Sequence, residues 1–112
     1  MNIIISARQP ELSSDVERRF GRCPSFVKID TDTMQWEGFA NPAAAQSGGA
    51  GVAAGQFVVN QGVQAVISGD FGPNAAGVLR AANIEMLLFT AETETVQQAV
   101  DQYIQGKLPV FS

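Results

Sequence analysis

Short, continuous apolar runs predict three strands. They lie at residues 2–7, 64–68 and 84–89, and each is too short to form a core helix. In the first run, β-branched apolar residues follow one another without alternation, which indicates a strand covered on both faces. We therefore predict that residues 2–7 form the central strand of a sheet.

Two further strand-like segments are separated by a short polar stretch. Residues 24–30 and 34–40 flank Thr31, Asp32 and Thr33, and this separation and composition suit a hairpin. The two segments are predicted to pair antiparallel.

A short helical turn is predicted ahead of this hairpin. Ser13 or Ser14 can cap a turn that extends to Arg19. Val16 and Phe20 would then share one face of the turn.

A first full helix is predicted over residues 50–61. Its apolar residues recur at helical spacing, and Gly62 supplies a C-terminal stop. The apolar face consists of Val52, Ala53, Phe57 and Val58.

Two more helices follow in the second half of the chain. One begins at Pro73, a residue suited to the first helical position, and runs to about Ala82. The other is capped by Thr93 and ends at Gly106. Its apolar stripe consists of Val96, Ala99, Val100, Tyr103 and Ile104.

The resulting order is strand, hairpin, helix, strand, helix, strand, helix. Because strands and helices alternate in the second half, right-handed crossovers should place those strands parallel to one another, beside the first strand. This order predicts an α/β fold.

Composition and charge narrow the classes of protein. The chain has 46% hydrophobic and 16% charged residues, which is typical of a folded domain. A formal net charge of -4 argues against nucleic-acid binding. No apolar run approaches the roughly 20 residues that cross a bilayer, and the start lacks the features of a signal peptide. We therefore expect one domain over residues 1–112 in the cytoplasm, with no nucleic-acid or membrane partner.

Metal-ligating residue types are scarce. The sequence has no histidine, which is the commonest ligand for zinc, copper and iron and the usual general base near neutral pH. Cys23 is the single cysteine, and one thiolate cannot by itself close a four-ligand metal site. No catalytic residue is predicted.

Candidate binding residues should gather at one edge of the sheet. In an open α/β sheet, ligands bind beyond the carboxyl ends of the parallel strands. We expect three segments to meet there, namely the loop after Ala7, the glycine-rich stretch at 47–51 and the turn at 69–74.

Two of these segments lead into helices and are rich in glycine. Free backbone N–H groups at a helix start bind anions without side-chain charge, and glycine lets a bulky ligand approach. The alternative is that the glycines only make tight connections. The candidate residues are Ser47, Gly48, Gly49, Ala50 and Gly51 in the first segment, and Gly69, Phe71, Gly72 and Asn74 in the second.

A third candidate group precedes the hairpin. Arg19 and Arg22 could clamp an anion bidentately, and Cys23 could supply one soft metal ligand. Nearby basic charge would lower the pKa of this thiol if the groups are close in space. The alternatives are a solvated face for the arginines and a small buried hydrophobe for Cys23.

Several motifs occur together in a characteristic order. They are Arg-Phe-Gly-Arg-Cys-Pro at 19–24 with Phe26 and Asp30, Asn-Pro at 41–42, Gly-Gly-Ala-Gly at 48–51, Gly62-Val63, Gly-Pro-Asn-Ala at 72–75, and Thr95-Val96 with Tyr103 and Gly106. This combination resembles the dinitrogenase iron-molybdenum cofactor biosynthesis family over nearly the whole chain.

The resemblance implies a fold and a function. The fold is a ribonuclease-H-like five-stranded mixed sheet with flanking helices, in which the first three strands are antiparallel and the last two are parallel to the first. The function is that of a non-enzymatic carrier for an anionic metal-sulfide cluster of the molybdenum-copper or iron-molybdenum type, with cluster donor or recipient proteins as partners. Without histidine, the cluster would be held mainly by charge and hydrogen bonds.

Two other functions remain open at this stage. One is a protein-interaction module that regulates an iron-sulfur or redox system, with the uncharged loop 38–51 as its docking surface. The other is a metal-dependent nuclease, but the first strand has none of the carboxylates that Mg²⁺ would need. The sequence does not indicate an oligomeric state.

Overall fold

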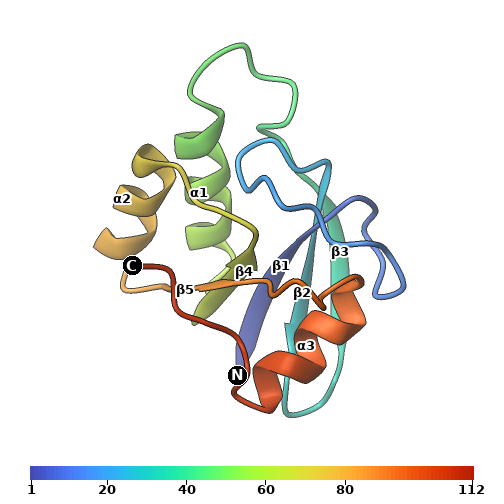
Figure 1. Cartoon of the computed structure of the whole chain (residues 1–112). Coiled ribbons are helices and arrows are strands. Elements are labelled where there is room, and N and C mark those ends of the chain that lie inside the picture. The colour runs from blue at the N-terminus through green and yellow to red at the C-terminus, as the bar shows by residue number, and fades with distance from the viewer.

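A five-stranded mixed sheet forms the centre of the protein in the computed structural model, which describes all 112 residues (Figure 1). The strand order is β3-β2-β1-β4-β5, so that β1 is the central strand as predicted. The strands are β1 (Asn2–Ala7), β2 (Ser25–Asp30), β3 (Trp36–Ala40), β4 (Ala65–Ser68) and β5 (Glu85–Leu88).

The pairing of the strands agrees with the predicted fold class. β1 and β3 both pair antiparallel with β2, which confirms the hairpin. β4 is parallel to β1, and β5 is parallel to β4. The carboxyl ends of β1, β4 and β5 therefore lie side by side, at the same end of the strands.

Helices cover both faces of the sheet. α1 (Ala50–Asn60) and α2 (Pro73–Ala81) lie on one face and α3 (Val96–Ile104) lies on the other (Figure 1). The alternation of side chains along β1 serves both layers, because Ile4 packs with α1 and α2 while Ile3 and Ile5 pack with α3. The uninterrupted apolar run thus reflects burial on two sides.

The predicted helical turn between residues 13 and 19 is wrong. This segment is irregular, with isolated bridges that pair Ala7 with Val16 and Asp15 with Thr95. Val16 packs in the core under α3, whereas Phe20 packs in the core under α1 and α2. The segment passes from one side of the sheet to the other, so tertiary contacts override its local helical preference.

The apolar face predicted for α1 is partly wrong. Val52 is 40% exposed, while the buried residues of this helix are Ala50, Ala54, Gly55 and Val58. The reason is close helix packing: a Cβ built on Gly55 would lie 3.1 Å from Cγ1 of Val78 on α2. Small residues therefore face α2, and size rather than hydropathy decides the buried side.

The predicted cap of α3 is displaced by two residues. Thr95, not Thr93, occupies the N-cap position, and its side chain accepts a hydrogen bond from the Gln98 amide. The Thr95 amide in turn donates to Oε1 of Gln98, which completes a capping box. The Thr93 side chain instead bonds Gln102 at 2.6 Å.

The two outer strands of the sheet, β5 and β3, differ in how their outer sides are covered. The C-terminal segment runs along β5, where the Leu88 amide donates to the Pro109 carbonyl and the Phe111 amide donates to the Met86 carbonyl. Beyond its ladder with β2, β3 exchanges no backbone hydrogen bond with another segment. One edge is covered and the other is open.

None of the three helices combines the length and the apolar content that crossing a bilayer requires.

Candidate functional site

Three segments meet beyond the carboxyl ends of the parallel strands. A Cβ built on Gly21 would lie 3.2 Å from the amide nitrogen of Gly51 at the start of α1. One built on Gly51 would lie 3.6 Å from the amide nitrogen of Ala75 in the first turn of α2. The segment around Gly21 thus lies against the start of α1, which in turn lies against the start of α2. The first residues of the loop after β1 do not lie beside these helix starts, because Pro10 packs against Gly38 of β3.

Both helix starts at this edge lack side-chain caps. The N-cap residues are Gly49 for α1 and Gly72 for α2, and neither first turn contains an acidic residue. No acceptor within the chain receives the amides of Ala50, Gly51 and Val52, or those of Asn74 and Ala75. These donors and the positive end of each helix dipole point toward the space in front of the helices.

The amide of Ala75 is the least expected of these free donors. Ala75 as a whole residue is only 2% exposed, and its amide has no acceptor within the chain. An anion in front of α2 would supply the missing acceptor.

The glycines predicted to contact a ligand fall into two groups. A Cβ on Gly48 or Gly72 would meet no atom within 4 Å, and neither residue has the positive φ that requires glycine. Gly49 does require it, with φ 71°. A Cβ on Gly69, in contrast, would lie 2.4 Å from Cβ of Arg18. Glycine is therefore required at position 69 because the chain passes close to Arg18 there. At Gly48 and Gly72 no neighbour requires glycine, and the space beside them is open.

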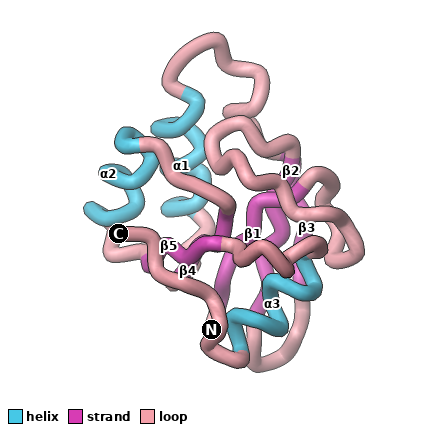
Figure 2. Tube along the Cα trace, viewed as in Figure 1, coloured by secondary structure: helices cyan, strands magenta, loops and turns pink.

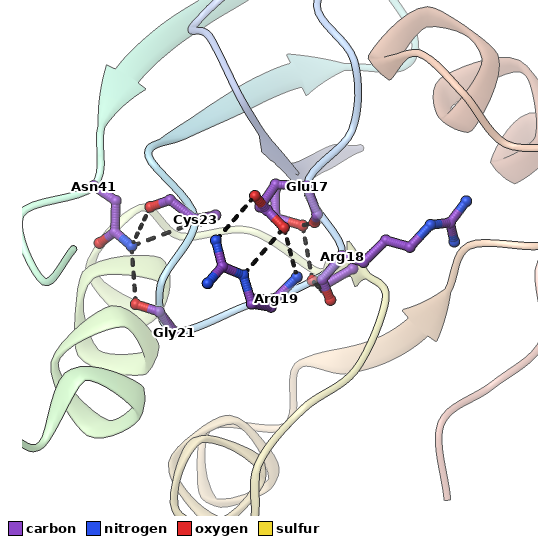
Figure 3. A network of polar contacts seen from close by, with 8 residues as sticks. Glu17, Arg18, Arg19, Gly21, Cys23 and Asn41 are labelled. Carbon is purple, nitrogen blue, oxygen red and sulfur yellow. Dashed lines mark hydrogen bonds and ion pairs between the residues drawn. The ribbon is translucent and has the colours of Figure 1, made fainter.

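The three arginines of residues 18–22 diverge and form no joint clamp. Arg18 donates from Nη2 to the Thr93 carbonyl at 3.0 Å, away from the helix starts. Arg19 is folded back onto the Glu17 carboxylate (Figure 3). Each guanidinium is engaged within the protein.

Arg22 holds the loop that leads into α1. Its Nη1 donates to the carbonyl of Gln46 and, at 3.5 Å, to that of Ala44. This loop, residues 41–49, extends from the end of the molecule (Figure 2). The predicted direct contact of Arg22 with an anion thus has a structural alternative, namely support of the Gly48–Gly49 segment.

Cys23 is fully buried, and the structure favours its packing role. Its exposed fraction is 0%. Burial raises the pKa of the thiol to about 12, although a hydrogen bond from Asn41 acts in the opposite direction. The condition for the arginines to lower this pKa is not met, because the charged group that acts on the thiol is the Glu17 carboxylate, which raises the pKa further.

The remaining predicted residues divide between core and surface. Phe71 is 5% exposed, and its ring lies 5.2 Å from those of Phe20 and Phe111, so it is a core residue. Ser47 and Asn74 are exposed, and their side chains make no hydrogen bond within the chain. No group of three or more His, Cys, Asp or Glu side chains is placed to hold a metal ion.

Two residues that the sequence prediction did not select organise the site. Asn41 is buried and donates from Nδ2 to the carbonyls of Cys23 at 2.9 Å and Gly21 at 3.2 Å (Figure 3). Its Oδ1 accepts from the Ala43 amide at 3.0 Å. The Asn-Pro dipeptide at 41–42 was the available signal, since asparagine often bonds its own backbone in turns.

Glu17 is the second of these residues. Its side chain is 12% exposed, and it accepts hydrogen bonds from the backbone and the guanidinium of Arg19. Burial alone would raise the pKa of this carboxyl, but the bonds from Arg19 together outweigh burial and the pKa lies below its usual value. No sequence pattern distinguished this pair from an ordinary surface ion pair.

Comparison with known proteins identifies the family. Residues 1–106 match the family described as dinitrogenase iron-molybdenum cofactor, and the chain belongs to this family. This result confirms the resemblance indicated by the sequence motifs.

Solved structures of similar proteins share the fold. The apo form of the orange protein from Desulfovibrio gigas has a TM-score of 0.91 and 34% identity, and the alignment covers 99% of this chain and 92% of that one. A Thermotoga protein provisionally described as NifB has a TM-score of 0.84 and 32% identity, over 99% and 96% of the two chains. An uncharacterised protein of Methanocaldococcus jannaschii is 26% identical over 82% of this chain and 79% of its own length.

Proposed function

We propose that this protein is a non-enzymatic carrier of an anionic metal-sulfide cluster, of the molybdenum-copper or iron-molybdenum type, in cofactor assembly or storage. The main observation in support of this proposal is the pair of uncapped helix starts at the carboxyl ends of the parallel strands. Their amides are free, and there is open space in front of Gly48 and Gly72. Membership of the family and the similarity to the apo orange protein support the chemical class of the cargo.

Backbone amides suit such a cargo. A metal-sulfide cluster spreads negative charge over several sulfur atoms, and a set of N–H groups at helix starts can donate to them without a formal positive charge. Absence of side chains at Gly48 and Gly72 lets a bulky anion approach these amides.

The residues around the site do not offer a set of covalent ligands. The chain has no histidine and its single thiol is buried and protonated at neutral pH. A cluster held by hydrogen bonds leaves without breaking metal-ligand bonds, which suits a carrier that passes its cargo to another protein. Cys23 is accordingly proposed as a packing residue rather than a metal ligand.

Anaerobic reconstitution tests the function. The purified protein is incubated with tetrathiomolybdate and Cu(I), or with iron, sulfide and molybdate, and then separated by gel filtration. We expect metal to co-elute with the protein and to give a visible charge-transfer band. A colourless, metal-free protein under all these conditions would refute the proposal, and recovery of a defined protein partner would then favour the interaction-module alternative.

Two glycine substitutions locate the binding site. Gly72→Ala places a methyl group in the open space, where it touches no atom of the protein. We therefore expect a folded variant that retains the metal-sulfide cluster about tenfold more weakly. Gly77→Ala is the matched control, because a Cβ there also meets nothing within 4 Å but lies one turn further along α2. Equal retention by the two variants would place the cargo elsewhere.

A further inference from the structure

Arg19, which could reach an anion in front of the helix starts, is engaged by an internal carboxylate. Nη2 of Arg19 lies 3.4 Å from Oε1 of Glu17, and Nε lies 3.4 Å from Oε2. The Arg19 amide also donates to Oε2, at 3.2 Å. Figure 3 shows the guanidinium turned back toward Glu17.

The two partners differ in their exposure to solvent. The Arg19 side chain is 67% exposed, whereas that of Glu17 is 12% exposed. Arg19 can therefore rotate away into water at little cost, but the Glu17 carboxylate would stay behind in a largely buried position. Only the backbone amide of Arg19 would then still donate to it, since the structure gives this carboxylate no other donor.

Backbone contacts place Arg19 beside the open helix starts. Arg19 forms an isolated bridge with Asp70, in the turn that leads into α2. Two residues further on, Gly21 lies against the start of α1. A long, exposed side chain at this position lies within reach of an anion bound there.

We infer that Glu17 is an internal competitor for Arg19 and sets how tightly the protein holds its cargo. The inference rests on the proposed function, because the competing ligand is the anionic cluster. When the cluster binds, Arg19 turns from Glu17 to the cluster, and the Glu17 carboxylate, left with the Arg19 amide and the more weakly acting Arg8 charge, subtracts from the affinity. When Arg19 returns to Glu17, the cluster loses a cationic contact and is released to a recipient.

Replacing Glu17 with glutamine separates this role from simple folding. Glutamine has nearly the same shape and keeps a carbonyl oxygen that accepts from the Arg19 amide, but it lacks the charge that attracts the guanidinium. With tetrathiomolybdate as the probe, followed by its absorption in anaerobic titrations, we expect Glu17→Gln to bind about tenfold more tightly than the wild type and to release the probe more slowly.

A second carboxylate at the site provides a matched control. Asp70 is exposed and forms no ion pair with Arg19, so Asp70→Asn removes one negative charge without freeing a guanidinium. Both substitutions are combined with Arg19→Ala. We expect the gain from Glu17→Gln to vanish when Arg19 is absent, whereas any small gain from Asp70→Asn should persist.

The outcomes separate the inference from the function on which it rests. If the wild type binds the probe but Glu17→Gln does not bind it more tightly, or gains equally without Arg19, the competitor role is wrong and the carrier function stands. If neither the wild type nor Glu17→Gln binds the probe while both remain folded by circular dichroism, the competitor role is overturned as well. A gain that depends on Arg19 supports it.

Discussion

The start of α3 and the starts of α1 and α2 follow opposite rules. In α3, the amides of Val96 and Gln97 donate to the carbonyls of Ser14 and Leu12, and those of Thr95 and Gln98 complete the capping box. In α1 and α2, no first-turn amide has an acceptor and no side chain caps the helix. The protein thus provides hydrogen-bond acceptors for the first amides of α3 but none for those of α1 and α2.

This difference separates stability from binding. Compared with glycine, a side-chain cap is worth roughly 0.3 kcal/mol, and nothing in the backbone at Gly72 prevents one, since its φ of -63° and ψ of 162° suit a capping residue. The open helix starts therefore give up stability that the α3 start keeps. They lie together at the sheet edge where α/β folds bind ligands, which is the pattern expected if the amides are reserved for a ligand.

The largest expected effect concerns Cys23, whose thiol would be the alternative to the helix-start amides as the group that binds the cargo. Because its pKa is raised from 9.0 to about 12, at pH 8 the folded protein should have about a thousandfold less thiolate than the unfolded chain. Alkylation by iodoacetamide should be slower by a similar factor in the folded protein, and should rise with pH up to about 12. Rapid alkylation without unfolding, or loss of cargo in Cys23→Ala, would break the assignment to helix starts.

The next effect comes from closing an open helix start. Gly72→Asp supplies a cap for α2 and places a negative charge in front of it, so we expect about 0.5 kcal/mol more stability and roughly a hundredfold weaker probe binding. Denaturant unfolding and anaerobic titration measure the two quantities. Thr95→Asp, which exchanges one cap for another at α3, should leave binding unchanged; a loss there would point to a general charge effect.

Opening the closed helix start should affect stability alone. Thr95→Ala removes the cap of α3 and should lower the free energy of unfolding by about 1 kcal/mol. The probe should bind as in the wild type, because α3 lies on the other face of the sheet (Figure 1). Weaker binding in a fully folded variant would contradict the separation of the two kinds of helix start.

The smallest effect concerns the reciprocal half of the capping box. Gln98→Ala removes the acceptor of the Thr95 amide at 3.1 Å and of the Glu94 amide at 2.8 Å. Both groups are exposed, so water replaces the lost acceptor, and we expect a cost of about 0.5 kcal/mol in thermal or chemical unfolding. A cost equal to that of Thr95→Ala would show that the two halves of the box are not separable.

A continuous apolar run predicted β1, β4 and β5 because these strands are covered on both faces, whereas the helices were predicted from apolar residues at helical spacing and from their end signals. It did not predict the buried side of α1, where Gly55 and Val78 pack too closely for a larger residue. The cap of α3 was predictable, because Gln98 stands three residues after Thr95 and no Glu or Gln stands three residues after Thr93.

The candidate site was predictable as backbone and not as side chains. Glycine and proline at 48–51 and 72–73 indicate the helix starts directly in the sequence. The arginines are neighbours in the sequence, but Arg18 and Arg22 bond carbonyls in distant segments, at Thr93 and Gln46, while Arg19 bonds Glu17 two residues away. Such distant partners depend on how the chain folds over the sheet edge, which local patterns do not encode.

The unequal edges of the sheet limit how copies of this protein could polymerise. Pairing along an edge needs unpaired backbone groups on both molecules, and the C-terminal segment occupies those of β5. β3 keeps unpaired backbone groups along its outer side, so it is the original strand of this sheet to which another copy could add directly. The residues after position 106 lie outside the family match, and they shield β5 from direct pairing with another copy.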